Sequence, residues 1–420
     1  MNAILAIPLE LRLLVIFLAG VLLGTQANRG IYRLAWFARP IGPWSLPHPD
    51  VPPRGRWDRL PLVGWWLLRR ESPWHGRGYW IRPILIELGF GVALAVLYWY
   101  EVAQAGVANF DPGPWTLHVQ FLTHCLLIWL MLVATFIDFD EQTIPDAITI
   151  PGTLLGLTIA ALWPDSRAIV RVPAPEGRVH DFLHIGSGVA LPAHRGWPEW
   201  LDGPAGLGIG ILCLCGWSFA VMSYTWTMRR GLRKAIEYAC ASAARHPINL
   251  AIGVICLSGI LATTGTWWWG GAHWESLLSA LVGMVVGGGA VWAVRIVGSS
   301  ALGQEAMGFG DVTLMAAIGA FTGWQATLII FFLAPFSAVF IAITQFLLTR
   351  RHDIAFGPYL CASAVIWLTH SGALWDHYGW PIFSLGWWVP GLGAFGLVLM
   401  GILLMLLRML RGEPIPDAGP

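Results

Sequence analysis

The chain has 420 residues, of which 56% are hydrophobic and only 12% are charged. A soluble domain carries about 25% charged residues, so this composition excludes a globule that folds in water. The formal net charge of +1 gives no general basic field, and no nucleic-acid partner is expected.

The predicted elements are apolar helices, because a membrane-spanning helix needs about 20 mostly apolar residues. The shortest apolar stretch, 312–324, crosses the membrane only if neighbouring helices bury it. With that stretch counted, the fold class expected is an all-α polytopic membrane protein with about eleven transmembrane helices. The predicted spans are 9–25, 82–100, 117–137, 145–163, 204–224, 248–268, 276–297, 312–324, 326–348, 354–370 and 385–407.

Basic residues indicate the orientation of these spans. Segment 26–82 holds ten arginines, and further clusters lie at 229–234, 350–351 and 408–411. Lys and Arg gather on the cytoplasmic side of membrane proteins. An odd number of spans with an outside N-terminus places all four clusters in the cytoplasm. The residues before the first apolar run contain no Lys or Arg, which favours an uncleaved first span over a signal peptide.

Two polar segments interrupt the apolar pattern at the expected cytoplasmic face. The third span ends in FIDFDEQTIPD, at 136–146, and the seventh span is followed by GQEAMGFGD, at 303–311. Carboxylates at this depth are costly, so they are candidates for function by default.

Some of these carboxylates have structural explanations. Asp146 follows Pro145 at the start of the fourth predicted helix, where a carboxylate interacts favourably with the positive end of the helix dipole. Asp140 and Glu141 would be solvated loop charges. In the spans, Glu87 is expected to pair with Arg82.

Asp138 and Asp311 are harder to explain by structure alone. Asp138 ends a long apolar helix, where the dipole disfavours negative charge. Asp311 could be an N-cap, but capping does not require Gly308 and Gly310, which indicate a backbone that another chain or a substrate approaches closely. Two carboxyl groups that share a proton can hydrolyse a peptide bond. The sequence leaves open whether these two meet. His124, inside the third span, is expected to be a hydrogen-bonded bundle residue.

Four ordered segments resemble the bacterial type IV prepilin peptidases, a family of GxGD-type intramembrane aspartyl proteases. The stretch ID-x-D-x-x-x-x-PD, at 137–146, is similar to the family's first aspartate motif, and GFGD, at 308–311, to its second. Segment 59–88 resembles the cytoplasmic loop that leads into the second span, and FGP, at 356–358, resembles a late segment of the family.

The resemblance implies a GxGD aspartyl protease-like bundle in the bacterial inner membrane, with its active site facing the cytoplasm. It implies cleavage of the leader of prepilin or pseudopilin substrates within the lipid bilayer, without a cofactor for proteolysis. S-adenosylmethionine is implied only if the N-methylation that many members perform is retained. The catalytic pair implied is Asp138 and Asp311, and the supporting residues are Gly308, Gly310, Asp140, Pro145 and Asp146.

The chain departs from the family in two places. The first loop lacks the paired cysteines that many members carry, and His48 and His75 alone predict no metal site. The second departure is an insertion between two parts of the membrane core. The predicted division of the chain follows from it. A first span at 1–25 and an Arg-rich loop at 26–81 precede core segments at 82–163 and 276–370, with an inserted outer loop and two extra spans at 164–275 and an extra span and tail at 371–420.

Two other functions stay open at this point. A proton-coupled transporter would use the two aspartates as a relay, but it predicts an internal repeat of broken spans, which the sequence does not show. A non-catalytic pilin assembly factor would tolerate loss of either aspartate.

Overall fold

The computed structural model describes residues 5–39, 41–47, 50–51, 53–107, 112–167, 169–172, 181–184, 197–223, 233–234, 237, 241–242, 245–349, 355–386 and 388–410. The chain divides into two compact units. Unit 1 comprises Met1–Gly152, Ala168–Val170 and Phe332–Trp375, and unit 2 comprises Thr153–Arg167, Arg171–Phe331 and Asp376–Pro420. The basic clusters at 229–232 and 350–351 and His48 lie outside the described residues.

A helix coincides with every one of the predicted apolar stretches. Within the described residues, eight helices are long and apolar enough to cross a membrane, which confirms the polytopic helical class. The number of crossings stays a prediction. The eight are α2 Leu9–Leu34, α5 Ile81–Tyr98 with its extension to Ala103, α6 Pro114–Glu141, α8 Pro204–Val221, α10 Pro247–Trp269, α11 Gly271–Leu302, α13 Trp324–Thr349 and α16 Trp388–Leu410. Shorter or less apolar are α7 Asp146–Leu162, α12 Phe309–Thr322 and α14 Gly357–Leu374.

The segment predicted as an outer loop contains a short two-stranded sheet. Its strands are β1 Ile169–Val172 and β2 Asp181–His184. Among the other short elements are the helices α3 Val63–Leu68, α4 Ser72–His75 and α15 Trp380–Ser384.

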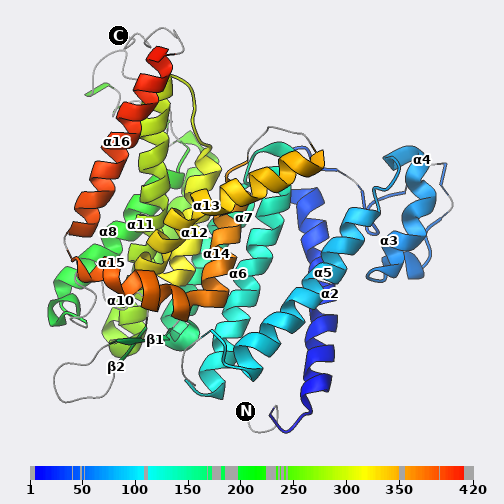
Figure 1. Cartoon of the computed structure of the whole chain (residues 1–420), viewed down its shortest axis with the longest axis horizontal. Helices are drawn as coiled ribbons and strands as arrows, with labels where there is room; N and C mark the ends of the chain where they lie inside the picture. Colours follow the sequence, from blue (N-terminus) through cyan, green and yellow to red (C-terminus); the bar gives the residue numbers. More distant parts are fainter. Residues whose placement is uncertain are drawn as a thin grey trace. The chain divides into compact units, whose positions relative to one another are not determined.

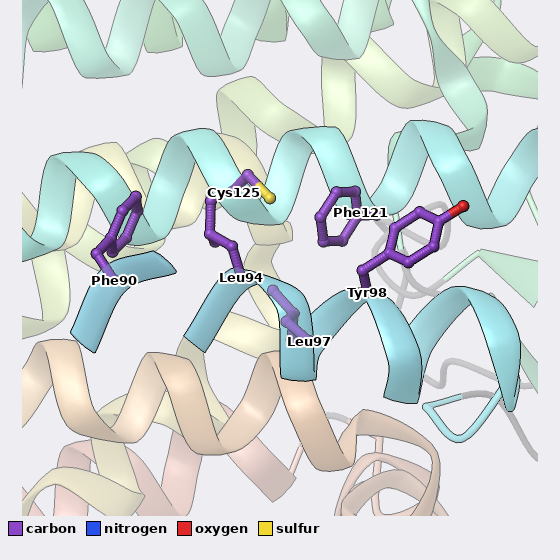
Figure 2. Packing of buried hydrophobic residues seen from close by; sticks show 6 residues of the cluster. All are labelled: Phe90, Leu94, Leu97, Tyr98, Phe121 and Cys125. Atoms are coloured by element: carbon purple, nitrogen blue, oxygen red, sulfur yellow. The ribbon is translucent and has the colours of Figure 1, made fainter. Parts of the chain in front are cut away.

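In unit 1, α2 packs closely along α5 (Figure 1). Glycines make the approach possible, because a Cβ atom on Gly20 would lie 2.7 Å from the Cα atom of Gly91. Figure 2 shows the next contact, in which α5 packs against α6 through a buried apolar cluster. The cluster comprises Phe90, Leu94, Leu97, Tyr98, Phe121 and Cys125.

The Arg-rich segment between α2 and α5 is folded and contains buried ion pairs. The Arg54 guanidinium binds the Glu71 carboxylate through two contacts of 2.6 and 2.8 Å, and Arg70 binds Asp58 at 2.7 Å. Burial, and then the charge of Glu71, raises the pKa of Tyr79, whose hydroxyl donates to the Leu68 carbonyl at 2.6 Å. Paired charges therefore hold the parts of this segment together.

Glu87 has different partners from the one expected. Its carboxylate accepts the backbone N–H of Leu62 at 2.6 Å and the indole N–H of Trp65 at 3.0 Å. Leu62 has a φ of 59°, which a branched side chain rarely adopts, so Glu87 stabilises a strained entry into α3. The expected Glu87–Arg82 pair is wrong, because Arg82 binds Asp140. The prediction for His124 is confirmed by its 2.7 Å contact with Glu101.

In unit 2, α12 packs against α11 along a stripe of glycines. A Cβ atom on Gly319 would overlap the backbone of Gly283, and one on Gly287 would lie 2.6 Å from the Met315 carbonyl oxygen. Gly283 and Gly287 therefore serve the close packing of these two helices. Helix α11 also packs against α8 and α16, and these contacts hold α12 in place.

Candidate active site

Asp138 lies in the last turn of α6 and is 5% exposed. The helix ends just beyond it, where Gln142 adopts a left-handed conformation, with φ 54°, and donates its N–H to the Asp138 carbonyl at 2.9 Å. An αL residue in this position closes the final turn of a helix. The local sequence therefore fixes the Asp138 carboxyl group on the buried side of the last turn of α6.

The Asp138 carboxylate lies against the first residue of α14. A Cβ atom on Gly357 would be 2.7 Å from Asp138 Oδ2 and 2.8 Å from the Ile144 side chain. Helix α14 begins at this glycine, after Phe356, and its first amide groups have no partners within the helix. The FGP segment thus forms one wall of the first aspartate motif, and its glycine is the residue that leaves room for the carboxylate.

Asp140 is exposed and Glu141 is half-buried, and both have partners. Asp140 accepts two bonds from Arg82, at 2.8 and 2.9 Å, and lies 3.8 Å from Arg39. Glu141 accepts the backbone N–H of Trp36 at 2.8 Å. These contacts tie the end of α6 to the start of α5 and to the chain that follows α2, so they orient the turn on which Asp138 sits.

Pro145 and Asp146 have the structural role that their sequence predicts. Helix α7 begins at Asp146, and the Pro145 carbonyl accepts the N–H of Ile148 at 3.0 Å. The exposed Asp146 carboxylate lies in the first turn, where the helix dipole favours a negative charge.

Asp311 is the third residue of α12 and is 8% exposed. The N-cap of this helix is Gly308, so the expectation that Asp311 itself could be the N-cap is wrong. Gly308 has a φ of −68°, which any residue can adopt, and a Cβ atom added there would lie 3.7 Å from Asp311 Oδ2. Gly308 therefore leaves free space beside the carboxylate rather than allowing an unusual backbone. Gly310 is the helical residue immediately before it.

The loop that carries the second motif is fastened to α11 by a residue that sequence reasoning missed. Arg295 donates to the Met307 carbonyl at 2.9 Å and pairs with Glu305 at 2.6 Å. Its guanidinium also lies 5.8 Å from the ring centroid of Phe309. An arginine inside the predicted span 276–297 was the available signal, since a charge at that depth needs a partner or a function.

Removing Arg295 is expected to loosen the motif loop. Arg295→Ala should lower kcat about tenfold and leave KM within about twofold, because small displacements of catalytic groups reduce the chemical step. The control is Glu305→Gln, which removes only an exposed charge and should cost little. Steady-state kinetics on the prepilin substrate that the sequence resemblance implies separate the two parameters. Equal kcat for wild type and Arg295→Ala would show that the loop does not need this contact.

No metal site is expected, and within the described ranges no group of three or more His, Cys, Asp or Glu residues could hold a metal ion. His75, which together with His48 predicts no metal site, lies 3.6 Å from Glu71 in the first loop.

Two segments of the chain, 125–172 and 247–343, match the Type IV leader peptidase family. Over these segments the chain is similar to that family. Each segment contains one of the two motif aspartates, Asp138 or Asp311. Residues 173–246 lie outside the match with the leader peptidases. That gap falls within the predicted insertion at 164–275, whose bounds stay a prediction.

Curated relatives of the chain carry the name prepilin leader peptidase/N-methyltransferase. The protein of Aeromonas hydrophila is 35% identical over 99 residues, which are 22% of this chain and 33% of the relative. The protein of Escherichia coli strain K12 is 38% identical over 92 residues, 21% of this chain and 41% of the relative. That of Pectobacterium carotovorum subsp. carotovorum is 30% identical over 130 residues, 30% of this chain and 44% of the relative. The chain thus spans less than half the length of these relatives. No solved structure matches it.

Proposed function

We propose that the chain is a membrane-embedded aspartic endopeptidase that removes the leader peptide of prepilin-like proteins. The observation that carries the proposal is that each family-matched segment holds one buried motif aspartate at the end of an apolar helix. Asp138 is 5% exposed in the last turn of α6, and Asp311 is 8% exposed in the first turn of α12. Carboxylates so placed are functional candidates by default.

The proposed chemistry uses Asp138 and Asp311 as one acid–base pair. The ionised carboxylate takes a proton from a water molecule, which then attacks the carbonyl carbon of the scissile peptide bond. The protonated partner donates a hydrogen bond to the carbonyl oxygen, where negative charge develops. Gly357 leaves the space in which the Asp138 carboxylate sits, and Gly308 leaves space beside that of Asp311.

The proposed location is the bacterial inner membrane, with both aspartates at the cytoplasmic face. In unit 1, the end of α6 contacts the start of α14 and the start of α5, the latter through the Arg82–Asp140 pair. In unit 2, the end of α16 contacts the end of α11, where Arg408 donates to the Ala301 carbonyl at 3.4 Å. Both arrangements agree with helices that alternate in direction as the basic clusters predict. Prepilins or pseudopilins are the proposed substrates, with their apolar helices in the bilayer.

A methyl-transfer role is proposed from the names of the relatives alone. S-adenosylmethionine would supply the methyl group, and it carries a net positive charge. The described part of the chain has a cavity of about 640 Å³ at the end of α2, but Arg29, Arg33 and Arg39 line it and no acidic residue does. This lining does not fit a cationic methyl donor, so no methyl-transfer step is derived from it. Proteolysis by two carboxyl groups requires no cofactor.

The test is leader removal by the purified chain in nanodiscs with a prepilin from the same genome. Mass spectrometry of the product should show one cut between the leader and the apolar helix, without added cofactor. A second sample with S-adenosylmethionine would gain 14 mass units, about one methyl group, if methylation is retained. An intact prepilin after prolonged incubation with folded protein would contradict the peptidase proposal and favour the transporter or the assembly factor.

A further inference from the structure

The cavity at the end of α2 is bordered by the first loop. Its volume is about 640 Å³, and its lining comes from the last turns of α2, from residues 38–39 and 41–46 and from Trp65. All of these residues belong to unit 1. This volume lies within the range of about 300–1,000 Å³ that is typical of small-molecule sites, and a phospholipid headgroup is a group of that size.

The charge of the cavity is positive. Arg29, Arg33 and Arg39 line it, and no aspartate or glutamate does. Arg29 and Arg33 are one turn apart on α2, where like charges destabilise a helix. Neither has an ion-pair partner in the part of the chain that the structure describes. Arg39 lies 3.8 Å from Asp140, but Arg82 binds that carboxylate more closely. A concentration of guanidinium groups without counter-charge indicates an anionic ligand.

The floor of the cavity also offers a hydrogen-bond acceptor. Asn28 is 1% exposed, and its amide group donates to the Pro83 carbonyl at 2.9 Å and to Glu87 at 3.2 Å. These bonds fix the amide orientation and leave Asn28 Oδ1 buried without a partner. Buried acceptors are nearly always satisfied, so this oxygen calls for a donor on the ligand. The ligand should therefore combine an anion with a hydroxyl or amine.

Buried contacts hold the outer wall of the cavity in place. Arg54 donates to the carbonyls of Gly42 and Ser45, at 2.7 Å each, and is fixed by its pair with Glu71. Only 7% of the Arg54 side chain and none of that of Glu71 is exposed. A wall that is anchored by a buried ion pair indicates a preformed site, which binds with a smaller entropic cost.

Exposed apolar side chains beside the cavity indicate a lipid rather than a dissolved anion. Leu46, which lines the cavity, is 91% exposed, and Trp36 and Phe37, which follow α2, are 83% and 72% exposed. Aromatic residues at the end of a span occupy the interface between membrane and water. Basic pockets at the same level bind the headgroups of anionic lipids.

We propose that the cavity binds the headgroup of an anionic glycerophospholipid, with the phosphodiester at Arg29, Arg33 and Arg39 and a headgroup hydroxyl donating to Asn28 Oδ1. Phosphatidylglycerol has both groups. The site is separate from the proposed peptidase chemistry, and its basic lining repels the basic leader of a prepilin. Bound lipid would supply the counter-charge that the end of α2 lacks.

The experiment measures lipid binding to the full, delipidated chain by native mass spectrometry. Phosphatidylglycerol should bind at least tenfold more tightly than phosphatidylcholine.

The Arg29→Gln/Arg33→Gln variant should lose about thirtyfold in affinity for phosphatidylglycerol, since each arginine near the surface contributes about fivefold. The control variant Arg56→Gln/Arg59→Gln removes the same charge from exposed positions outside the cavity and should change affinity less than about threefold. Phosphatidylmethanol keeps the phosphodiester but lacks the hydroxyls, so it should bind more weakly than phosphatidylglycerol.

Three results would overturn the proposal. One is equal affinity of wild type and Arg29→Gln/Arg33→Gln for phosphatidylglycerol, at matched melting temperature. Another is displacement of the lipid by millimolar inorganic phosphate, which would identify a site for a free anion. The third is displacement by S-adenosylmethionine, which would identify the cavity as the methyl-donor site. Because the readout is binding, it is independent of whether the chain cleaves a prepilin.

Discussion

Replacing Asp138 or Asp311 with asparagine is expected to lower leader cleavage by about 1000-fold or more, while the protein stays folded. Asparagine has nearly the size of aspartate but cannot exchange a proton, and acid–base groups contribute about 100- to 10,000-fold each. Both carboxyl groups are buried, at 5% and 8% exposure. Removing a buried charge costs little stability and can raise it. Activity should therefore fall while the melting temperature in detergent stays equal or rises.

The double variant tests whether the two residues act as a unit. When two groups take part in the same chemical step, the effects of replacing them on the rate are strongly non-additive. Asp138→Asn/Asp311→Asn should therefore cleave no more slowly than the slower of the two single variants. Asp140→Asn is the matched control, because it removes a motif aspartate that binds Arg82 instead of reacting. It should keep at least a tenth of the wild-type kcat. Cleavage by either catalytic variant at a rate close to wild type would exclude the pair and favour the assembly-factor interpretation.

The helical fold could be predicted from composition because a membrane helix must satisfy its own backbone hydrogen bonds. Even the short stretch at 312–324 is helical, as α12, because small residues pack it closely against α11. The length of an apolar run does not predict where a helix ends when that helix continues into polar residues. Helix α2 continues to Leu34, nine residues beyond the predicted span, because Asn28 and Thr25 are buried against α5.

The sequence predicted the two aspartates of the candidate site but not the contacts that position them. Asp138 and Asp311 stand out because charge is rare in apolar sequence. The FGP segment was singled out in the sequence without its contact with Asp138, and Arg295 stood out as a charge inside a span without its partners. A single sequence does not encode which residues touch. Glu87 illustrates the same limit, since its partners are the backbone of Leu62 and the indole of Trp65 rather than the nearby Arg82.

Replacing Gly357 with alanine is expected to lower kcat about 100-fold with KM nearly unchanged. The added Cβ atom would lie 2.7 Å from Asp138 Oδ2 and 2.8 Å from the Ile144 side chain. Two non-bonded heavy atoms cannot remain at that distance, so the carboxylate must move by several tenths of an ångström. A displacement of about 1 Å in a reacting group can cost about 100-fold. The loss should appear in kcat because the substrate still binds while the acid–base group is misplaced.

The control for this substitution is Gly89→Ala in α5, where no heavy atom lies within 4 Å of the added Cβ atom. Both changes add one methyl group to a helical glycine, and alanine is the better helix former by about 1 kcal/mol. Gly89→Ala should therefore keep full activity and stability. If Gly357→Ala cleaved a prepilin as fast as Gly89→Ala, Asp138 would have to tolerate displacement, which a general acid or base in a defined geometry does not. Retained activity would thus remove the start of α14 from the catalytic site, whereas a pure kcat defect in a stable protein would show that the FGP segment sets the position of the Asp138 carboxylate.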